Sequence, residues 1–174
     1  DFCLSRGLGD VYKRQHLYGL ELQRALHQGE FVLFYQPQIR LADNSLAGAE
    51  ALLRWRHPER GMLSPAAFLP ALQNGPLAAT VGNWVLDEAC AQAAEWMRHG
   101  VRDFRMGVNL FGAQFRMDDL ASRVTSALER HGLPPAALEL EITEDIVLDH
   151  DDLVLESLQL LRSKGAVSYT HLRA

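Results

Sequence analysis

Apolar and polar residues alternate in three stretches of the chain, 46–55, 104–110 and 138–143. This two-residue period is typical of β-strands that bury one face and keep the other face polar. In the first stretch, one face would carry only apolar side chains, from Ala49, Ala51, Leu53 and Trp55. The opposite face would carry Gly48, Glu50, Leu52 and Arg54. A carboxylate on that face is costly to bury without a cation or a donor, so the face meets either water or a positive charge.

A fourth stretch, 31–39, is rich in strand-forming residues. The turn residues at 42–45 predict that 31–39 and 46–55 form an antiparallel hairpin. Helical spacing of apolar residues predicts helices in much of the remaining chain. These helices are expected at 16–29, 65–72, 81–98, 118–131 and 149–164, with no element at 1–15 and a loop at 57–64.

Strands and helices alternate after the hairpin, which predicts βα units and a parallel sheet. Each of these strands has one apolar and one polar face, whereas an open sheet covered on both sides has strands that are apolar on both faces. The pattern therefore favours an α/β fold of the TIM type, a (β/α) barrel with an antiparallel first strand. Because such a barrel has eight strands and needs about 250 residues, we expect an incomplete barrel with about four of the strands.

Composition and charge narrow the classes of function. The chain has 174 residues, 48% of them hydrophobic, and a formal net charge of −5. One globular domain is expected, and the acidic balance argues against binding to a nucleic-acid polymer, which needs a basic face. Two cysteines do not form a disulfide framework, and no apolar run approaches the roughly 20 residues of a membrane helix. These features predict a cytoplasmic protein, although regions outside this sequence could carry a membrane anchor.

Three polar side chains would meet in the predicted barrel. Glu50, Asn109 and Glu141 would point inward near the C-terminal ends of three successive strands, where barrel enzymes have their sites. Each of them offers an oxygen ligand, and this donor set suits a hard cation such as Mg²⁺ or Mn²⁺. On the same face, Arg54 is suited to a phosphate group, and Gln36 is suited to a hydrogen bond with the same ligand.

Each of these residues also has an ordinary structural interpretation. Glu50 would be a half-exposed strand residue, Asn109 a turn residue, and Glu141 part of a solvated strand face. Arg54 would only pair with Glu50, and Gln36 would only satisfy neighbouring backbone groups. The occurrence of all three oxygen ligands at strand ends favours the metal site over these alternatives.

Six short motifs follow one another along the chain. They are Tyr35-Gln36-Pro37, Glu50-Ala51-Leu52 continuing into Leu53-Arg54-Trp55, Phe68-Leu69-Pro70, Trp84-Val85-Leu86, Val108-Asn109-Leu110 and Glu141-Ile142-Thr143-Glu144. In this order they resemble the EAL domain family over about residues 17–167. We therefore interpret residues 16–167 as the N-terminal portion of an EAL domain.

The resemblance implies a function. EAL domains are cyclic-di-GMP phosphodiesterases on a modified TIM barrel, and they hydrolyse cyclic-di-GMP to linear pGpG with two divalent metals, Mg²⁺ or Mn²⁺. The residues that would bind metal, and act in catalysis through it, are Glu50, Asn109 and Glu141. The residues that would contact the substrate are Gln36, Leu52 and Arg54, while Glu144 would position a loop. The family works in bacterial signalling, and its members are compatible with a homodimer and with fusion to sensory or GGDEF domains.

The chain departs from the family pattern at two places. Residues 71–75 read ALQNG, where the family usually has an acidic residue and a Glu-x-Gly-like stretch. Residues 168–174 read SYTHLRA, where the family has the end of a fifth strand and the paired aspartates that supply the second metal. Both ends of the chain resemble translated sequencing-adapter sequence, so we expect 1–15 and 168–174 to be non-native. The 174-residue chain alone is expected to bind metal weakly and to have no phosphodiesterase activity.

Two other functions are alternatives to the enzyme. One is a catalytically inactive EAL domain that binds cyclic-di-GMP as a receptor, and the other is a non-enzymatic interaction module. Degenerate members of the family usually lose metal ligands, whereas Glu50, Asn109 and Glu141 are all present here. This observation favours the enzyme.

Overall fold

A computed structural model of the protein describes residues 19–116, 119–143, 146, 151–163 and 165–171. The chain divides into two compact units. The first unit comprises Asp1–Val32 and Leu53–Ala78, and the second comprises Leu33–Leu52 and Ala79–Ala174. Two long strands, β1 (Phe31–Ile39) and β2 (Leu46–His57), contribute residues to both units.

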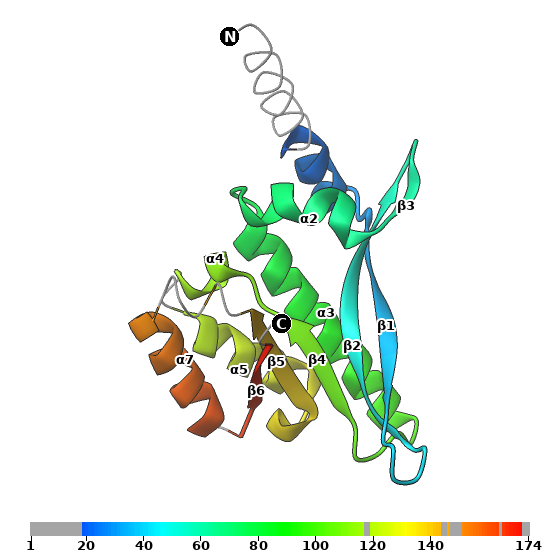
Figure 1. Cartoon of the computed structure of the whole chain (residues 1–174), viewed down its shortest axis with the longest axis vertical. Helices are drawn as coiled ribbons and strands as arrows, with labels where there is room; N and C mark the ends of the chain where they lie inside the picture. Colours follow the sequence, from blue (N-terminus) through cyan, green and yellow to red (C-terminus); the bar gives the residue numbers. More distant parts are fainter. Residues whose placement is uncertain (1–18, 117–118, 144–145, 147–150, 164, 172–174) are drawn as a thin grey trace, which may run out of the picture. The chain divides into compact units, whose positions relative to one another are not determined.

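The strands form one sheet in the order β1-β2-β4-β5-β6, with the short β3 paired to β2. Their bounds are Gly61–Leu63 for β3, Arg105–Asn109 for β4, Leu138–Thr143 for β5 and Val167–His171 for β6. The pairs β2–β4, β4–β5 and β5–β6 are parallel, and Figure 1 shows β4, β5 and β6 next to one another. Arg40 N donates to Ser45 O, and Arg56 N donates to Glu30 O. Residue numbers therefore rise along one strand while they fall along the other, which confirms the antiparallel hairpin.

Helices connect the strands, as the apolar periodicity predicts. Residues 19–27 are helical, and the later elements are α2 (Pro65–Gln73), α3 (Ala78–Arg98), α4 (Gly112–Phe115), α5 (Leu120–His131), the 3-10 turn η1 (Pro135–Ala137) and α7 (Asp151–Ser163). The helix α2 begins with Pro65, and α5 ends at Gly132, whose φ of 65° favours glycine. Within the described ranges, no helix is both long enough and apolar enough to cross a membrane.

The strand β3 lies where the sequence predicted only a loop. It exists because β2 continues to His57 and pairs with it antiparallel, with Trp55 opposite Leu63 and His57 opposite Gly61. Gly61 has a φ of 69°, which allows the tight reversal between the two strands. A strand of three residues is too short to show a two-residue period, so the sequence contained no pattern for it.

The strand β6 is a second difference from the expected fold. The sequence analysis expected about four strands and a non-native segment at 168–174. Instead the backbone of β6 pairs in parallel with β5, from Val167 opposite Glu139 to His171 opposite Thr143. Strand pairing uses backbone N–H and C=O groups, so an open strand edge accepts a neighbouring segment that lacks strand-breaking residues. The path through the sheet therefore has five strands in the described part of the chain.

The second unit buries the apolar face of its strands, as predicted. The buried strand residues are Ala49, Ala51, Met106, Val108, Leu138, Leu140 and Ile142. The apolar stripes of α3 and α5 are buried at Val81, Val85, Cys90, Ala93, Ala94, Leu120, Val124 and Leu128. Burial, with a smaller effect of Asp87, raises the pKa of the Cys90 thiol to about 12. Cys90 is therefore a packing residue and not a reactive thiol.

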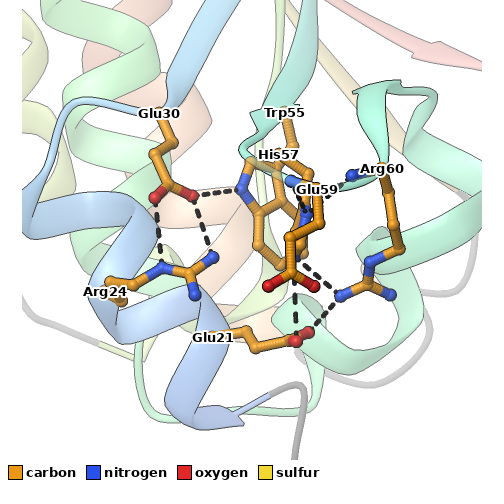
Figure 2. A network of polar contacts seen from close by, with 7 residues as sticks. All are labelled: Glu21, Arg24, Glu30, Trp55, His57, Glu59 and Arg60. Atoms are coloured by element: carbon orange, nitrogen blue, oxygen red, sulfur yellow. Dashed lines mark hydrogen bonds and ion pairs between the residues drawn. The ribbon is translucent and has the colours of Figure 1, made fainter.

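Trp55 occupies the core of the first unit. It is completely buried, and its ring centroid lies 6.0 Å from that of Phe31 and 5.6 Å from that of Phe68. Its Nε1 donates a hydrogen bond of 2.8 Å to Oε2 of Glu30. Glu30 also forms an ion pair with Arg24, with 3.1 Å between Glu30 Oε1 and Arg24 Nε (Figure 2). The buried indole N–H and the carboxylate beside it thus satisfy each other.

His57 stabilises the turn between β2 and β3. The sequence suggested a loop residue, but the side chain is only 2% exposed. Its Nδ1 accepts hydrogen bonds from the backbone N–H groups of Glu59 and Arg60, both at 3.1 Å (Figure 2). The other ring nitrogen, Nε2, lies 2.9 Å from Nη2 of Arg60. An ion pair between Arg60 and Glu21 joins this turn to the helical residues 19–27.

The contacts of Glu30 predict a loss of stability in acid. Burial by itself raises the pKa of Glu30, but the hydrogen bond from Trp55 and the ion pair with Arg24 outweigh it and lower the pKa below its ordinary value of 4.5. A lowered pKa stabilises the fold above the ordinary pKa, and this stability is lost as pH falls through the lower folded-state value. Glu30→Gln should therefore reduce the free energy of unfolding by about 1 kcal/mol at neutral pH.

The difference between Glu30→Gln and the wild type should shrink as the pH falls below 4.5. Urea unfolding, followed by tryptophan fluorescence from neutral pH downward, measures this difference. Glu59→Gln is the matched control, because it removes an exposed carboxylate from the same unit. A Glu30→Gln difference that is constant with pH would contradict the ion-pair interpretation.

Candidate functional site

The three predicted oxygen ligands lie on neighbouring strands of the second unit. Glu50 is on β2, Asn109 is on β4 and Glu141 is on β5. In the register of the sheet, Glu50 lies opposite Gly107, and Asn109 lies opposite Glu141. Because side chains alternate along a strand, all three side chains project from the same face of the sheet. The structure therefore brings these three residues together, as the sequence predicted.

A direct hydrogen bond connects two of them. The side-chain amide Nδ2 of Asn109 donates to Oε1 of Glu50 at 2.7 Å. An amide group carries its donors on nitrogen and its acceptor on oxygen, so this bond uses Nδ2 and leaves Oδ1 outside the contact. The bond fixes the orientation of the Asn109 side chain relative to the Glu50 carboxylate. Asn109 is the last residue of a strand and does not lie in a turn.

Glu141 is almost completely buried, with 3% of its surface exposed. This burial excludes the interpretation of Glu141 as part of a solvated strand face. A Cβ atom placed on Gly107 would lie 2.5 Å from Oε1 of Glu141 and 3.6 Å from Cα of Glu50. The carboxylate of Glu141 thus lies over Gly107, in space that any other residue at that position would fill.

Gly107 is a residue of the site that the sequence analysis did not single out. A glycine inside a strand often marks a close approach of another group, and this signal was present in the motif around Val108. The identity of the approaching group, however, depends on the register of β4 against β5. The sequence pattern does not contain that register.

The expected position at the strand ends needs a correction. Asn109 is the last residue of β4, but Glu50 is the fifth residue of a strand that continues to His57. The parallel pairing of β2 with β4 covers only Gly48–Ala51, and the later part of β2 pairs with β3 instead. Glu50 therefore lies near the end of the parallel-paired part of β2, and not near the end of the strand itself.

The other predicted site residues lie on β1 and β2 or outside the described residues. Gln36 is exposed on β1, and Leu52 is half-buried on β2. Arg54 belongs to the first unit, where its Nη1 donates to the carbonyl oxygen of Leu53 at 2.9 Å. Glu144 lies outside the described residues. The substrate contacts assigned to Gln36, Leu52 and Arg54 therefore stay predictions.

The donor set fits a small hard cation. Two carboxylates and an amide oxygen are the ligand types that Mg²⁺ and Mn²⁺ prefer. Within the ranges that the structure describes, no group of three or more histidine, cysteine, aspartate and glutamate side chains is placed to hold a metal ion. A cation bound by Glu50 and Glu141 would therefore need the amide oxygen of Asn109 as its third protein ligand.

Comparisons with known proteins identify the family. The family model described as EAL domain matches residues 20–167. The chain belongs to the EAL domain family. It is 40% identical over 145 residues to the bifunctional diguanylate cyclase/cyclic di-GMP phosphodiesterase MucR of Pseudomonas aeruginosa. The matched region covers 83% of this chain and 21% of MucR. The chain thus spans about a fifth of the length of this relative.

Solved EAL structures have the same fold. The cyclic-di-GMP complex of the PaMucR phosphodiesterase matches with a TM-score of 0.82 and 38% identity, over 87% of this chain and 62% of that chain. The cAMP and cyclic-di-GMP bound form of the EAL enzyme Bd1971 matches with a TM-score of 0.84 and 27% identity, over 95% of this chain and 46% of that chain. These likenesses confirm the α/β, TIM-type architecture of the EAL domain.

The space above Gly107 leads to a prediction on stability. Alanine in a strand is normally slightly favourable relative to glycine, because glycine loses more backbone entropy on folding. Gly107→Ala should nevertheless lower the free energy of unfolding by about 1–3 kcal/mol, because its Cβ collides with the buried Glu141 carboxylate. Urea unfolding of the purified chain measures the change.

Gly112→Ala is the matched control for this prediction. Among the residues that the structure describes, a Cβ on Gly112 would meet only Cγ1 of Ile146, at an ordinary contact distance of 3.6 Å. The control should unfold within about 0.5 kcal/mol of the wild type. A Gly107→Ala variant as stable as the wild type would show that Glu141 does not occupy this space.

Proposed function

We propose that the protein is a cyclic-di-GMP phosphodiesterase that opens the cyclic dinucleotide to linear pGpG with Mg²⁺ or Mn²⁺. The observation that carries this proposal is the grouping of Glu50, Asn109 and Glu141 on one face of three neighbouring strands in an EAL domain. The naming of a similar relative as a phosphodiesterase, and the cyclic-di-GMP complex of a similar structure, support it. The reaction consumes one water, breaks one P–O bond of the ring and leaves a terminal phosphate.

In this proposal, Glu50, Glu141 and the amide oxygen of Asn109 hold the divalent cation. When bound, such a cation supplies the activation of water and the neutralisation of charge that develops on phosphate oxygens. Nδ2 of Asn109 holds the Glu50 carboxylate in place through the 2.7 Å hydrogen bond. Gly107 leaves the space in which the Glu141 carboxylate lies.

The substrate contacts are assigned to three further residues. The Arg54 guanidinium would bind a phosphate of cyclic-di-GMP, because its paired N–H donors match phosphate oxygens. Gln36 would donate a hydrogen bond to the same ligand, and Leu52 would supply an apolar contact. Glu144 would position a loop beside the site. A complete EAL domain would use two metals, with the second held by residues beyond this set.

Hydrolysis by the whole protein tests the proposal. The protein that contains this chain is incubated with cyclic-di-GMP and Mn²⁺, and pGpG is measured by chromatography. Glu50→Gln, Asn109→Ala and Glu141→Gln should each lower kcat about 100-fold or more, because the two glutamines remove the negative charge of a carboxylate ligand and the alanine removes the amide oxygen. Glu139→Gln changes a half-buried carboxylate on the same strand and face as Glu141, and should leave kcat within about twofold.

The result also separates the enzyme from its alternative. Binding of cyclic-di-GMP without hydrolysis by the wild-type protein would instead indicate a receptor. Equal activity of Glu141→Gln and Glu139→Gln would show that the three-ligand assignment is wrong.

The isolated 174-residue chain is expected to behave differently from the whole protein. Residues 168–174 contain no aspartate or glutamate, whereas the family pattern has the paired aspartates of the second metal in this region. The chain alone should therefore bind Mn²⁺ weakly and release no pGpG, as measured by Mn²⁺ titration and chromatography. Turnover of cyclic-di-GMP by this chain with Mn²⁺ would contradict this expectation.

A further inference from the structure

A buried amide lies at the junction between β4 and α4, close to Asn109. The side chain belongs to Gln114, which is 1% exposed. Its Oε1 accepts a hydrogen bond of 2.9 Å from the backbone N–H of Phe111, two residues after Asn109. In return, the backbone N–H of Gln114 donates to the carbonyl oxygen of Phe111 at 2.9 Å. Both backbone polar groups of Phe111 are thus bound to the same residue.

The other end of the amide is held by α3. Nε2 of Gln114 donates to Oδ1 of Asn83 at 3.0 Å. One residue before Asn83, a Cβ placed on Gly82 would lie 2.4 Å from Oε1 of Gln114 and 2.6 Å from its Cδ. The Gln114 amide therefore lies directly against the backbone of α3, in space that Gly82 leaves open. With a donor and an acceptor both in use, the amide has one defined orientation.

The segment between these contacts carries the site. Leu110 N donates to the carbonyl oxygen of Glu141 at 2.9 Å, and Phe111 N donates to Gln114 Oε1. The backbone immediately after Asn109 is therefore fixed on one side to the strand of Glu141 and on the other side to α3. Gln114 is the third residue of the four-residue helix α4, and its amide binds the backbone of the N-cap residue Phe111, so one side chain both caps this helix and contacts α3.

We propose that Gln114 is a positioning residue for Asn109, acting through the Phe111 backbone and held in turn by Asn83 and Gly82. This inference rests on the proposed function, in which Asn109 is a cation ligand. Gln114 keeps the end of β4 in the conformation in which Asn109 Nδ2 reaches Glu50 Oε1. Without it, Asn109 stays present but loses its fixed orientation toward Glu50.

The primary test uses the metal-free 174-residue chain, so it does not depend on activity. Nuclear magnetic resonance measures hydrogen exchange of the Asn109 side-chain amide, which is protected by its bond to Glu50. Gln114→Met, which keeps the length of the side chain and removes both polar groups, should reduce this protection about tenfold. Gly82→Ala should have the same effect, because its Cβ displaces the Gln114 amide without changing Gln114 itself.

Two further variants separate positioning from general stability. Gln114→Glu retains an acceptor for Phe111 N–H but places a buried carboxylate oxygen against Oδ1 of Asn83, so it should lower the melting temperature and yet protect the Asn109 amide better than Gln114→Met does. Asn83→Ala removes the partner of Gln114 Nε2 but leaves the bond between Phe111 N and Gln114 Oε1 in place. It should lower the melting temperature and leave the protection of the Asn109 amide largely unchanged. Exchange of the amides of β5 serves as the internal standard for global unfolding.

Mn²⁺ binding to the same variants of the whole protein is the second readout, because the isolated chain is expected to bind Mn²⁺ weakly. Loss of an outer contact to a metal ligand typically lowers metal affinity roughly 10- to 100-fold, so Gln114→Met and Gly82→Ala should weaken Mn²⁺ binding by this factor relative to the wild type. Unchanged protection of the Asn109 amide in folded Gln114→Met and Gly82→Ala would overturn the inference, even if the whole protein hydrolyses cyclic-di-GMP. Loss of protection in both variants would support it, even if the whole protein were a receptor.

Discussion

The burial of a carboxylate inside the sheet is the constraint on which the site depends. Glu141 projects from the polar face of β5, yet it is 3% exposed. A buried carboxylate costs several kcal/mol unless a positive group or donors compensate for its lost hydration. On the neighbouring strand β4, Gly107 leaves room for the Glu141 carboxylate, and the amide of Asn109 binds the carboxylate of Glu50. This arrangement concentrates negative charge at one place, which favours a small divalent cation.

Glycine has the same role at two places in the second unit. Gly107 leaves space for the Glu141 carboxylate, and Gly82 leaves space for the Gln114 amide. Neither glycine has an unusual backbone angle, so the reason for each of them is close approach and not a turn. Both glycines allow a polar side chain to lie against the backbone of a neighbouring element. Asn109 lies along the chain between Gly107, which makes the first contact, and Gln114, which makes the second.

The first unit contains a half-buried carboxylate, Glu30, with different partners. Glu30 is compensated within the protein, by the ion pair with Arg24 and by the indole N–H of Trp55. The pKa of Glu30 is accordingly lowered, despite the opposing effect of burial. At Glu50 the partner that the structure shows is a neutral amide. A guanidinium completes a structural ion pair, whereas a neutral amide leaves the carboxylate's charge available to a ligand.

The sequence by itself determined the four strands β1, β2, β4 and β5, the long helices, the buried faces of these strands and the resemblance to the family. Alternation of two residues and helical spacing are local properties, so Ala51, Val108 and Leu140 could be assigned to the buried face from the pattern alone. Only the tertiary structure decided the register that places Asn109 opposite Glu141, the short strand β3, the added strand β6 and the burial of Gln114. These features depend on contacts between residues that are far apart in the chain, or on backbone pairing that is almost independent of side-chain type. A local pattern does not contain either kind of information, because the partner of each group is chosen only when the elements pack together.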